Sequence, residues 1–400
     1  MMFGWAGRVL RVDLSTAEIE TEPLEPSVAR TYLGGRGLAT HLYRRGAPAA
    51  AQPLRSAERL VFATGPLTGT LAPNGGRFVV VSKGKKAGAP AAASLGGSFG
   101  AEVKFAGFDA IILEGRAPEP VYLWIANHAA ELRPAGHLWG MTASQTLERI
   151  AAETSAKAKT CCLGPAGEKG AGQAVVVSTH AAPAGGEDIG AVMGFKNLKA
   201  VAVQGTLGFR VAAPREFLAA AAQLRAKLAA RPLLCRGFRM DDSVLLVVGA
   251  RQDGEGREGE WAMPHGCLAC STKFASFRMP EGEVRAGDWP ACGGLAGAPE
   301  AMVWAQVAGS EPAPGAYPPT EHGGCRVGGY TIMPRLVAGD SAEQALAAVA
   351  DSATLCPFAL AALDAADIAA LLSTATGIAY SAEEVMGVGQ RLAEEWGASP

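Results

Sequence analysis

Short runs of β-branched and apolar residues, separated by glycine-rich segments, dominate the first half of this chain. The runs have the length and alternation of β-strands, and Gly, Pro or Asn bounds them. We expect strands over 8–14, 59–64, 78–82, 108–113, 121–125, 174–178 and 200–203. Two helices are expected among them, one over 27–45 and one beginning at the capping box of Thr142 and Gln145. The first 206 residues therefore predict a sheet-rich domain.

The second half of the chain changes to helical patterns. Pro214 stands where a first-turn proline belongs, and 216–230 is a strong helix former. Capping boxes that begin at Ser341 and Ser381 each predict a further helix. The polar segment 251–260 and the Gly/Pro-rich segment 286–319 are expected to be loops. The change of pattern near 207–214 predicts a domain boundary, with 1–208 and 209–400 as the two units.

Composition and charge exclude several classes of function. The chain has 36 Lys and Arg against 38 Asp and Glu, so its net charge of −2 offers no general attraction for a nucleic acid. Hydrophobic residues make up 49%, which excludes general disorder. No uncharged apolar stretch reaches the roughly 18 residues needed to cross a membrane, and the first residues lack the pattern of a signal peptide. We therefore expect a soluble, cytoplasmic protein with no nucleic-acid or membrane partner.

Eight cysteines in 400 residues are too few for a disulfide scaffold, so their spacing carries the information. Only Cys267 and Cys270 have the spacing of metal ligands. A zinc site needs a second Cys or His pair, which the remaining candidates do not form. An iron–sulfur cluster accepts ligands that are distant in sequence, and Cys356 is such a candidate. The alternative is a pair of buried cysteines that bind nothing.

Glycines gather in clusters at the ends of the expected strands. Such loops can present backbone N–H groups to an anion, with Arg77 as a charged partner. They can equally provide the tight turns of a β-rich domain, which is the simpler explanation of the glycines alone. The clusters lie at 34–37, 65–69, 74–77, 96–100, 164–167 and 185–186.

Longer motifs run in order through the whole first half. They are Gly7–Leu14, Tyr32–Leu38, Phe62–Gly69, Gly76–Val81, Gly96–Gly97, Phe99–Asp109, Pro120–Trp124, Gly164–Glu168 and Gly190–Lys199. In this order they resemble the tungsten-dependent aldehyde:ferredoxin oxidoreductase family, and repeated turn formation does not produce such a series. In the second half the resemblance is limited to Cys267, Cys270 and the segment 351–356.

The resemblance implies an α+β fold, with a two-sheet base domain over 1–208 and a shortened, mainly α-helical region over 209–400. The base domain of that family carries two pterins that hold tungsten or molybdenum, with Mg²⁺ bridging their phosphates. The implied cofactor-binding residues are Arg77, Ser94, Gly96, Gly97, Gly185, Gly186 and Asp351. The implied ligands of a [4Fe–4S] cluster, which would pass electrons singly to a ferredoxin, are Cys267, Cys270 and Cys356.

The chain departs from the family pattern at several positions. Phe274 replaces a third cysteine of the cluster motif, so the cluster would have three thiolates, be absent, or take a fourth ligand from Cys292, Cys325 or His265. Ser94 stands in place of an asparagine that binds Mg²⁺, and Thr354 in place of a glycine.

Acidic residues and a missing stretch mark two further departures. Gly186 replaces an arginine and is followed by Glu187 and Asp188, whose repulsion of a phosphate would cost about 1 kcal/mol or more. The stretch between Cys270 and Cys356 is shorter than in the family, which keeps its acid/base glutamate and histidine there. Glu321 and His322 are the one Glu/His pair that could replace them, although adjacent polar residues in such a loop are more often a solvated turn.

Three functions follow from these observations. The first is an oxidoreductase that interconverts a small aldehyde and its carboxylate at a tungstopterin, with electrons leaving through the cluster to ferredoxin or another electron-transfer protein. The second is a non-catalytic relative that serves as a subunit or scaffold, and the third is an electron carrier with the cluster alone. The resemblance also implies a possible homodimer.

Overall fold

The computed structural model describes most of the first half of the chain and the C-terminal helices. The described residues are 2–45, 59–83, 90–171, 174, 176–179, 189–229, 341–356, 359–360 and 362–396, with the backbone of six short strands between 236 and 331. Within this part of the chain, no helix is long and apolar enough to cross a membrane.

The first sheet has six strands in the order β2-β1-β6-β3-β4-β5. Neighbours are antiparallel except β1 and β6, which run parallel. Strand β3 is buried on both faces: Phe62 faces one core, and Val61 and Ala63 face another. The strands are β1 (Arg8–Asp13), β2 (Glu18–Pro23), β3 (Leu60–Ala63), β4 (Phe78–Lys83), β5 (Pro90–Leu95) and β6 (Ala110–Glu114).

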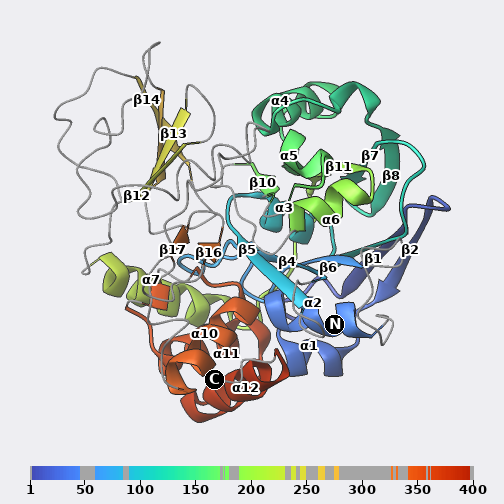
Figure 1. Cartoon of the computed structure of the whole chain (residues 1–400). Helices are drawn as coiled ribbons and strands as arrows, with labels where there is room; N and C mark the ends of the chain where they lie inside the picture. The colour runs from blue at the N-terminus through green and yellow to red at the C-terminus, as the bar shows by residue number, and fades with distance from the viewer. Residues whose placement is uncertain are drawn as a thin grey trace.

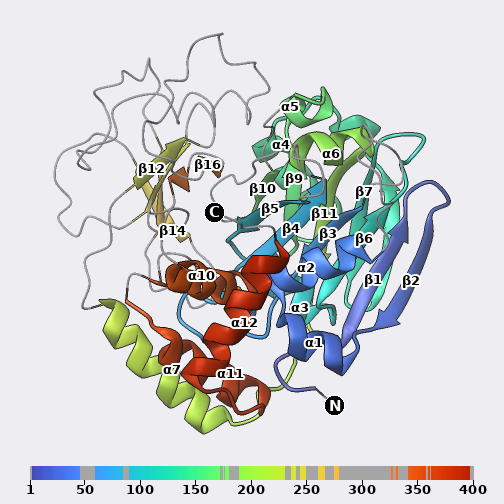
Figure 2. The same cartoon turned by 60° about the horizontal axis from the view of Figure 1, so that its bottom comes forward.

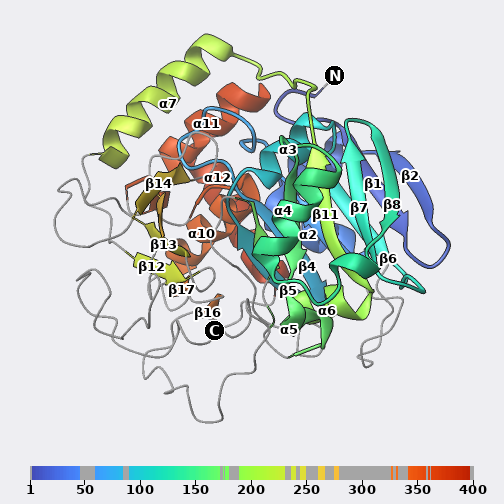
Figure 3. The ribbon, with the colours of Figure 1, turned by 90° about the horizontal axis from the view of Figure 1, so that it is seen from above.

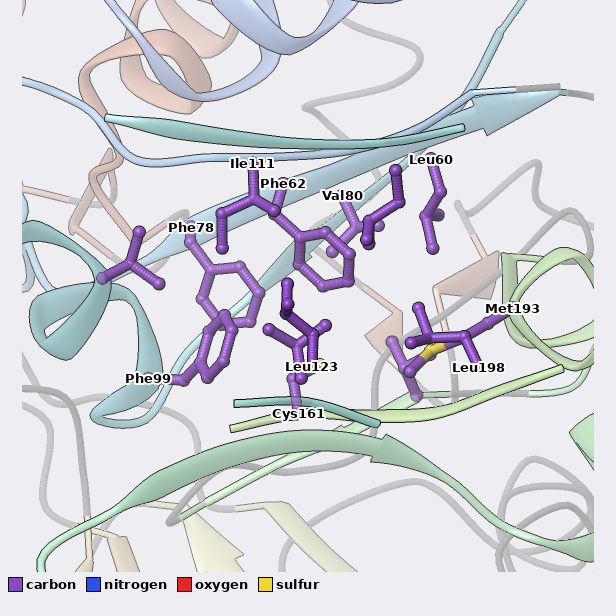
Figure 4. Close-up of a cluster of buried hydrophobic side chains, with 14 of the residues drawn as sticks. Leu60, Phe62, Phe78, Val80, Phe99, Ile111, Leu123, Cys161, Met193 and Leu198 are labelled. Carbon is purple, nitrogen blue, oxygen red and sulfur yellow. The ribbon is translucent and has the colours of Figure 1, made fainter. Parts of the chain in front are cut away.

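The second sheet has five strands in the order β10-β9-β11-β7-β8 and packs face to face against the first. Figure 4 shows the apolar side chains between the two sheets. Side chains of β7 alternate between faces: Leu123 lies in this inner core, whereas Tyr122 and Trp124 pack on the outer face. The strands are β7 (Val121–Ala126), β8 (Ala129–Pro134), β9 (Lys159–Leu163), β10 (Val176–Ser178) and β11 (Leu198–Gln204).

Helices cover the outer faces of both sheets (Figure 1). Leu38 and Leu42 of α2 pack on Val61 and Val79 of the first sheet, and Ile150 of α4 belongs to the apolar cluster on the outer face of the second. The helices of the first half are α1 (Pro26–Tyr32), α2 (Gly35–Arg44), α3 (Phe99–Phe105), the 3₁₀ turn η1 (Gly136–Leu138), α4 (Ala143–Glu153), α5 (Pro165–Glu168) and α6 (Ile189–Phe195).

The helices of the second half share an apolar core to which Leu33 and Leu67 of the first half also contribute. Helix α10 packs against α12 and against α2 (Figure 2), and α7 packs against α11 (Figure 3). These helices are α7 (Pro214–Ala229), α10 (Ser341–Ala353), α11 (Ala365–Thr376) and α12 (Ala382–Glu395). The expected α+β architecture, with two sheets followed by helices, is confirmed, while the boundary at 208 stays a prediction.

Short strands also occur where the sequence analysis expects a mainly helical region. Four of them form an antiparallel sheet in the order β12-β13-β15-β14, and β16 pairs with β17. Runs this short carry little periodicity of their own, so pairing with neighbours decides their conformation. They are β12 (Arg236–Arg239), β13 (Val244–Val248), β14 (Glu260–His265), β15 (Phe274–Arg278), β16 (Arg326–Val327) and β17 (Tyr330–Thr331).

The expected single helix over 27–45 is wrong, because two helices occupy this stretch. The chain leaves the helical conformation at Leu33, whose φ is +58°, and α2 begins at Gly35. A Cβ atom at Gly34 would lie 2.4 Å from the Cα of Gly65. The break therefore allows two backbone segments to approach closely, which the helical pattern could not reveal.

Capping boxes predicted helix starts more reliably. The reciprocal hydrogen bonds of Thr142 with Gln145 and of Ser381 with Glu384 are both present at the starts of α4 and α12. Helix α10 begins at Ser341, as expected. An additional box, formed by Asp364 and its third neighbour, begins α11 and was not predicted.

A buried ion pair forms between Lys104 of α3 and Asp109, which directly precedes β6, and it contacts the loop that contains Gly65. Lys104 and Asp109 are fully buried, with Nζ 2.6 Å from Oδ1. Lys104 also donates to the carbonyl of Gly65 at 3.0 Å, and Asp109 accepts from the amide nitrogens of Ala6 and Gly7. Because neither charged side chain is exposed to solvent, each depends on the other for compensation.

Replacing Lys104 with Met should therefore destabilise the fold strongly. Asp109 would remain buried without its cation, and the free energy of unfolding should fall by about 3–5 kcal/mol. Urea denaturation measures this change. Lys227→Met is the matched control, because Lys227 pairs with Asp367 on the surface and its loss should matter little. Equal losses of unfolding free energy in the two variants would contradict the role of Lys104 in compensating the buried charge of Asp109.

Candidate functional site

Four of the predicted site residues lie near one another in the described part of the chain. Arg77 directly precedes β4, Ser94 lies in β5, and Asp351 and Cys356 lie at the end of α10 and just beyond it. The other predicted residues with described positions, Gly96 and Gly97, follow β5 directly. Outside the described residues are Gly185, Gly186, Glu187, Asp188, Cys267, Cys270, Cys292, Glu321, His322 and Cys325. Only the backbone is described for His265 and Phe274.

Arg77 brings Ser94 and Cys356 together. Its Nε donates to Ser94 Oγ at 2.8 Å, and its Nη2 donates to the Ser94 carbonyl. Its Nη1 lies 3.7 Å from Cys356 Sγ, within the range of a hydrogen bond to sulfur. Both Arg77 and Cys356 are buried. Strand β4 pairs with β5 antiparallel, with Val79 opposite Ser94, and this register delivers the serine to the guanidinium.

Backbone hydrogen bonds at the end of α10 also hold Cys356 in place. Thr354 adopts the left-handed conformation, with φ of +65°, and the amide nitrogen of Leu355 donates to the carbonyl of Ala350 at 2.8 Å. These are the features of a Schellman helix end, in which glycine is the usual residue at the left-handed position. The amide of Cys356 then donates to the carbonyl of Asn74 at 2.8 Å. Cys356 is thus held through both its amide and its thiol.

Asp351 lies near the end of the same helix, beside Arg36. The Arg36 guanidinium is 3.9 Å from the Asp351 carboxylate and stacks on the Trp396 ring at 4.2 Å. Burial raises the pKa of Asp351 above its ordinary value, while the positive charges of Arg36 and Arg77 oppose the shift. The carboxylate therefore costs stability when it ionises, a property found often at functional sites.

Glycines at the N-terminal side of α2 and after β3 let this segment approach. A Cβ atom at Gly35 would lie 2.1 Å from the carbonyl oxygen of Asp351, and one at Gly65 would lie 2.8 Å from the Thr354 side chain. One at Gly34 would lie 3.1 Å from the carbonyl oxygen of Ser352. At these three glycines the structure shows close packing within the chain, the simpler of the two explanations given above.

The loop that contains Gly96 and Gly97 joins the two sheets. Gly97 has φ of +84°, which favours glycine. The Gly96 carbonyl accepts from Ser178 Oγ at 3.3 Å, and the amide of Ser98 donates to the Thr179 carbonyl at 3.3 Å. The loop is therefore fixed at the seam between β5 and β10, and its contact with a cofactor stays a prediction.

The described residues have the chemistry to hold an organic cofactor. The Arg77 guanidinium can serve hydrogen-bond acceptors or phosphate, and the Asp351 carboxylate can accept from ring N–H groups. Among the candidate cluster ligands, Cys356 is the one whose side chain is described. No group of three or more His, Cys, Asp or Glu side chains within the described ranges is arranged to hold a metal ion.

Two further thiols are structural. Cys161 and Cys162 are fully buried in β9 and belong to the cores on opposite faces of the second sheet. Burial raises the pKa of Cys161 well above its ordinary value and raises that of Cys162 to about 12. Both therefore stay protonated and inert as ligands.

Arg36 and Thr68 also belong to this site, although no sequence motif pointed to a role for either of them. Thr68 accepts from the amide of Gly65, donates to the Arg77 carbonyl and lies 2.8 Å from the Thr354 hydroxyl. Thr68 carried no signal of its own within its glycine cluster, since its partner is distant in the chain. The one available signal was Thr354, which stands where the family resemblance expects glycine.

Comparison with known families agrees with this architecture. Residues 9–205 match the family model of the aldehyde ferredoxin oxidoreductase N-terminal domain. Residues 9–205 therefore form an N-terminal domain of the aldehyde ferredoxin oxidoreductase type.

Individual relatives support the same assignment. The tungsten-containing aldehyde ferredoxin oxidoreductases of Pyrococcus furiosus and Thermococcus kodakarensis are each 40% identical to this chain over 254 residues, which are 63% of this chain and 42% of the relative. The WOR-like subunit of an aliphatic sulfonate oxidoreductase from Pyrococcus furiosus is 34% identical over 51% of this chain and 35% of that protein. The chain thus covers about two fifths of the length of the first two relatives.

A solved structure shares the fold. It is the active-site complex BamBC of benzoyl coenzyme A reductase with 1,5-dienoyl-CoA, 35% identical to this chain with a TM-score of 0.56. The similarity covers 58% of this chain and 35% of that one.

Gly65→Ala should weaken the docking of the 351–356 segment. The added methyl would meet Thr354 and the Ser352 carbonyl, and overpacking of this kind costs about 1–3 kcal/mol of unfolding free energy. Gly208→Ala is the control, because nothing lies within 4 Å of a Cβ atom there. Urea denaturation of both variants compares them, and a loss at Gly208 as large as at Gly65 would contradict the close approach.

Asp351→Asn should stabilise the fold at neutral pH. A raised pKa means that Asp351 contributes stability while protonated, below its ordinary value of 3.8, and loses it as the pH rises through the raised value. The neutral amide removes that loss, so the gain in unfolding free energy should shrink as the pH falls from 7 toward 4. Asp364→Asn should do the reverse, because the backbone hydrogen bond from Asp367 lowers the pKa of Asp364. Denaturation at several pH values tests both signs.

Proposed function

We propose that this chain is an oxidoreductase that interconverts a small aldehyde and its carboxylate, with a tungstopterin and a [4Fe–4S] cluster as cofactors. The match of residues 9–205 to the family's N-terminal domain and the 40% identity to a tungsten-containing aldehyde ferredoxin oxidoreductase support the proposal. A ferredoxin or another electron-transfer protein would accept the electrons. Location in the cytoplasm, homodimer formation and Mg²⁺ between pterin phosphates stay predictions.

The contact between Arg77 and Cys356 carries the proposal. These residues are 279 positions apart, both are buried, and their polar atoms lie 3.7 Å from each other. One is the candidate pterin contact and the other a candidate cluster ligand. When bound, the tungstopterin would supply two-electron chemistry at the substrate carbon, and the cluster would carry the electrons away singly.

Each described residue has a definite task in this proposal. Arg77 binds the organic cofactor and donates to Cys356 Sγ, while Ser94 fixes the guanidinium through two hydrogen bonds. Asp351 accepts hydrogen bonds from the cofactor, and Arg36 favours its ionised form. Gly96 and Gly97 present backbone groups at the seam of the two sheets.

Other proposed roles fall on residues whose positions are not described. Cys267 and Cys270 would join Cys356 as cluster ligands, and Gly185 and Gly186 would approach the cofactor. Glu321 and His322 remain the candidates for acid/base chemistry.

A second function is a non-catalytic subunit within a larger assembly. The relative from an aliphatic sulfonate oxidoreductase is itself described as a subunit, and the structural neighbour belongs to a complex. The chain matches only about two fifths of the length of the tungsten-containing relatives. In this case the two-sheet domain would serve as a scaffold, without its own redox chemistry.

Metal analysis of protein purified anaerobically from its native host separates these functions. Tungsten or molybdenum near one per chain, together with iron, is the expected result. Iron alone would point to an electron carrier, and the absence of all three would favour the scaffold. Expression without the pterin pathway is unsuitable, because it would remove tungsten for a reason unrelated to this chain.

In the same preparation, Cys356→Ser should abolish or weaken the visible absorbance of the cluster. Serine replaces a thiolate ligand and leaves the iron incompletely coordinated. Cys161→Ser is the matched control, since Cys161 is also buried but lies between the two sheets. A spectrum unchanged by the Cys356 substitution would remove this cysteine from the ligand set.

A further inference from the structure

Thr354 combines an unfavourable backbone with a specific hydrogen bond. Its φ of +65° is a conformation that β-branched residues rarely adopt. Its side chain is 1% exposed, and its hydroxyl lies 2.8 Å from the Thr68 hydroxyl. A residue in such a conformation persists only when its surroundings compensate for the strain.

We propose that Thr354 is a positioning residue that, through Thr68, holds Cys356 in register with Arg77. The importance of that register for electron transfer rests on the proposed function. The register itself is a property of the chain and can be measured without any cofactor.

The hydroxyl of Thr68 has a complete set of partners. It accepts from the amide of Gly65 at 3.0 Å and donates to the carbonyl of Arg77 at 2.9 Å. A hydroxyl has one proton and two lone pairs, so one acceptor position of Thr68 remains for the Thr354 proton, which Thr354 shares with the carbonyl of Ala353. The hydroxyls of Thr68 and Thr354 therefore connect the backbone of Arg77 to the segment that bears Cys356.

Gly65, which donates to Thr68, also contacts the buried ion pair of Lys104 and Asp109. The carbonyl of Gly65 accepts from Lys104, whose charge is balanced by Asp109. Gly65 is thus fixed at its carbonyl by the buried Lys104 and at its amide by the hydroxyl of Thr68. Thr354 attaches to this rigid group, two residues before Cys356.

The methyl group of Thr354 adds a steric component. A Cβ atom at Gly65 would lie 2.8 Å from Thr354 Cγ2, and one at Gly35 would lie 3.1 Å from it. The two glycines therefore accommodate a larger residue at the helix end. Glycine at position 354 would relieve the backbone but lose both the methyl contact and the hydroxyl.

The test is the rate at which iodoacetamide labels Cys356 in the full chain produced without tungsten or added iron. Peptide mass spectrometry follows each cysteine, with Cys161 and Cys162 as buried references in β9. Thr354→Val keeps the branched shape and removes the hydroxyl. It should accelerate labelling of Cys356 about tenfold and leave the two references unchanged. Thr354→Ser, which keeps the hydroxyl, should restore most of the slow rate.

Thr146→Val is the matched control variant. Thr146 is fully buried in α4, and its hydroxyl donates to the Thr142 carbonyl at 2.8 Å. General destabilisation would accelerate all three cysteines in both variants. Such a parallel acceleration, or an unchanged rate at Cys356 in Thr354→Val, would overturn the positioning role.

Thr354→Gly keeps the proposal testable if the valine variant does not fold. Glycine suits the left-handed backbone, so this variant should fold, yet Cys356 should still label faster than in the native chain. Slower or equal labelling would show that Thr354 has only a backbone effect. Metal content of the native protein is measured separately, so a chain without tungsten or iron would refute the proposed function while the labelling still decides the positioning role.

Discussion

The docking of the 351–356 segment onto the loops of the first sheet is the contact on which the rest of the site depends. It requires backbone atoms of α10 to come within van der Waals distance of Gly34, Gly35 and Gly65. Any side chain at these glycines would hold the helix end away. With the segment in place, Cys356 reaches Arg77 and the Asn74 carbonyl. The two halves of the chain can therefore approach each other here because these three positions carry no side chain.

Features that cost stability gather at this same contact. Asp351 has a raised pKa, Thr354 has a strained backbone, and Lys104 and Asp109 are charges without water. A second buried ion pair, between Lys199 of β11 and Glu168, lies at the second sheet, and apolar side chains fill the space between the two sheets (Figure 4). Natural proteins tend to accept such local penalties where a ligand or a reaction requires them. The proposed cofactor site would account for their retention at this contact.

The domain match and the site geometry support different parts of the interpretation. The match over 9–205 establishes the kind of domain. It does not include Asp351, Thr354 or Cys356, which approach that domain only through tertiary packing. The geometry at the end of α10 is therefore separate support for a site, since the matched domain alone does not specify it. A relative that had kept only the two sheets would have no need of a thiol beside Arg77.

The sequence by itself indicated seven of the eleven strands of the two sheets, the starts of α4, α7, α10 and α12, and the resemblance to the family. Alternating side chains report which face of a strand is buried, and capping boxes involve residues only three apart, so both signals are local. The break between α1 and α2, the strands after α7 and the meeting of Arg77 with Cys356 came only from the tertiary structure. The last two residues are 279 positions apart, and no local pattern records such a distance. Close packing against other segments decided these features. It overrides the helical pattern at Leu33, and it stabilises Thr354 at a helix end where glycine is the usual residue.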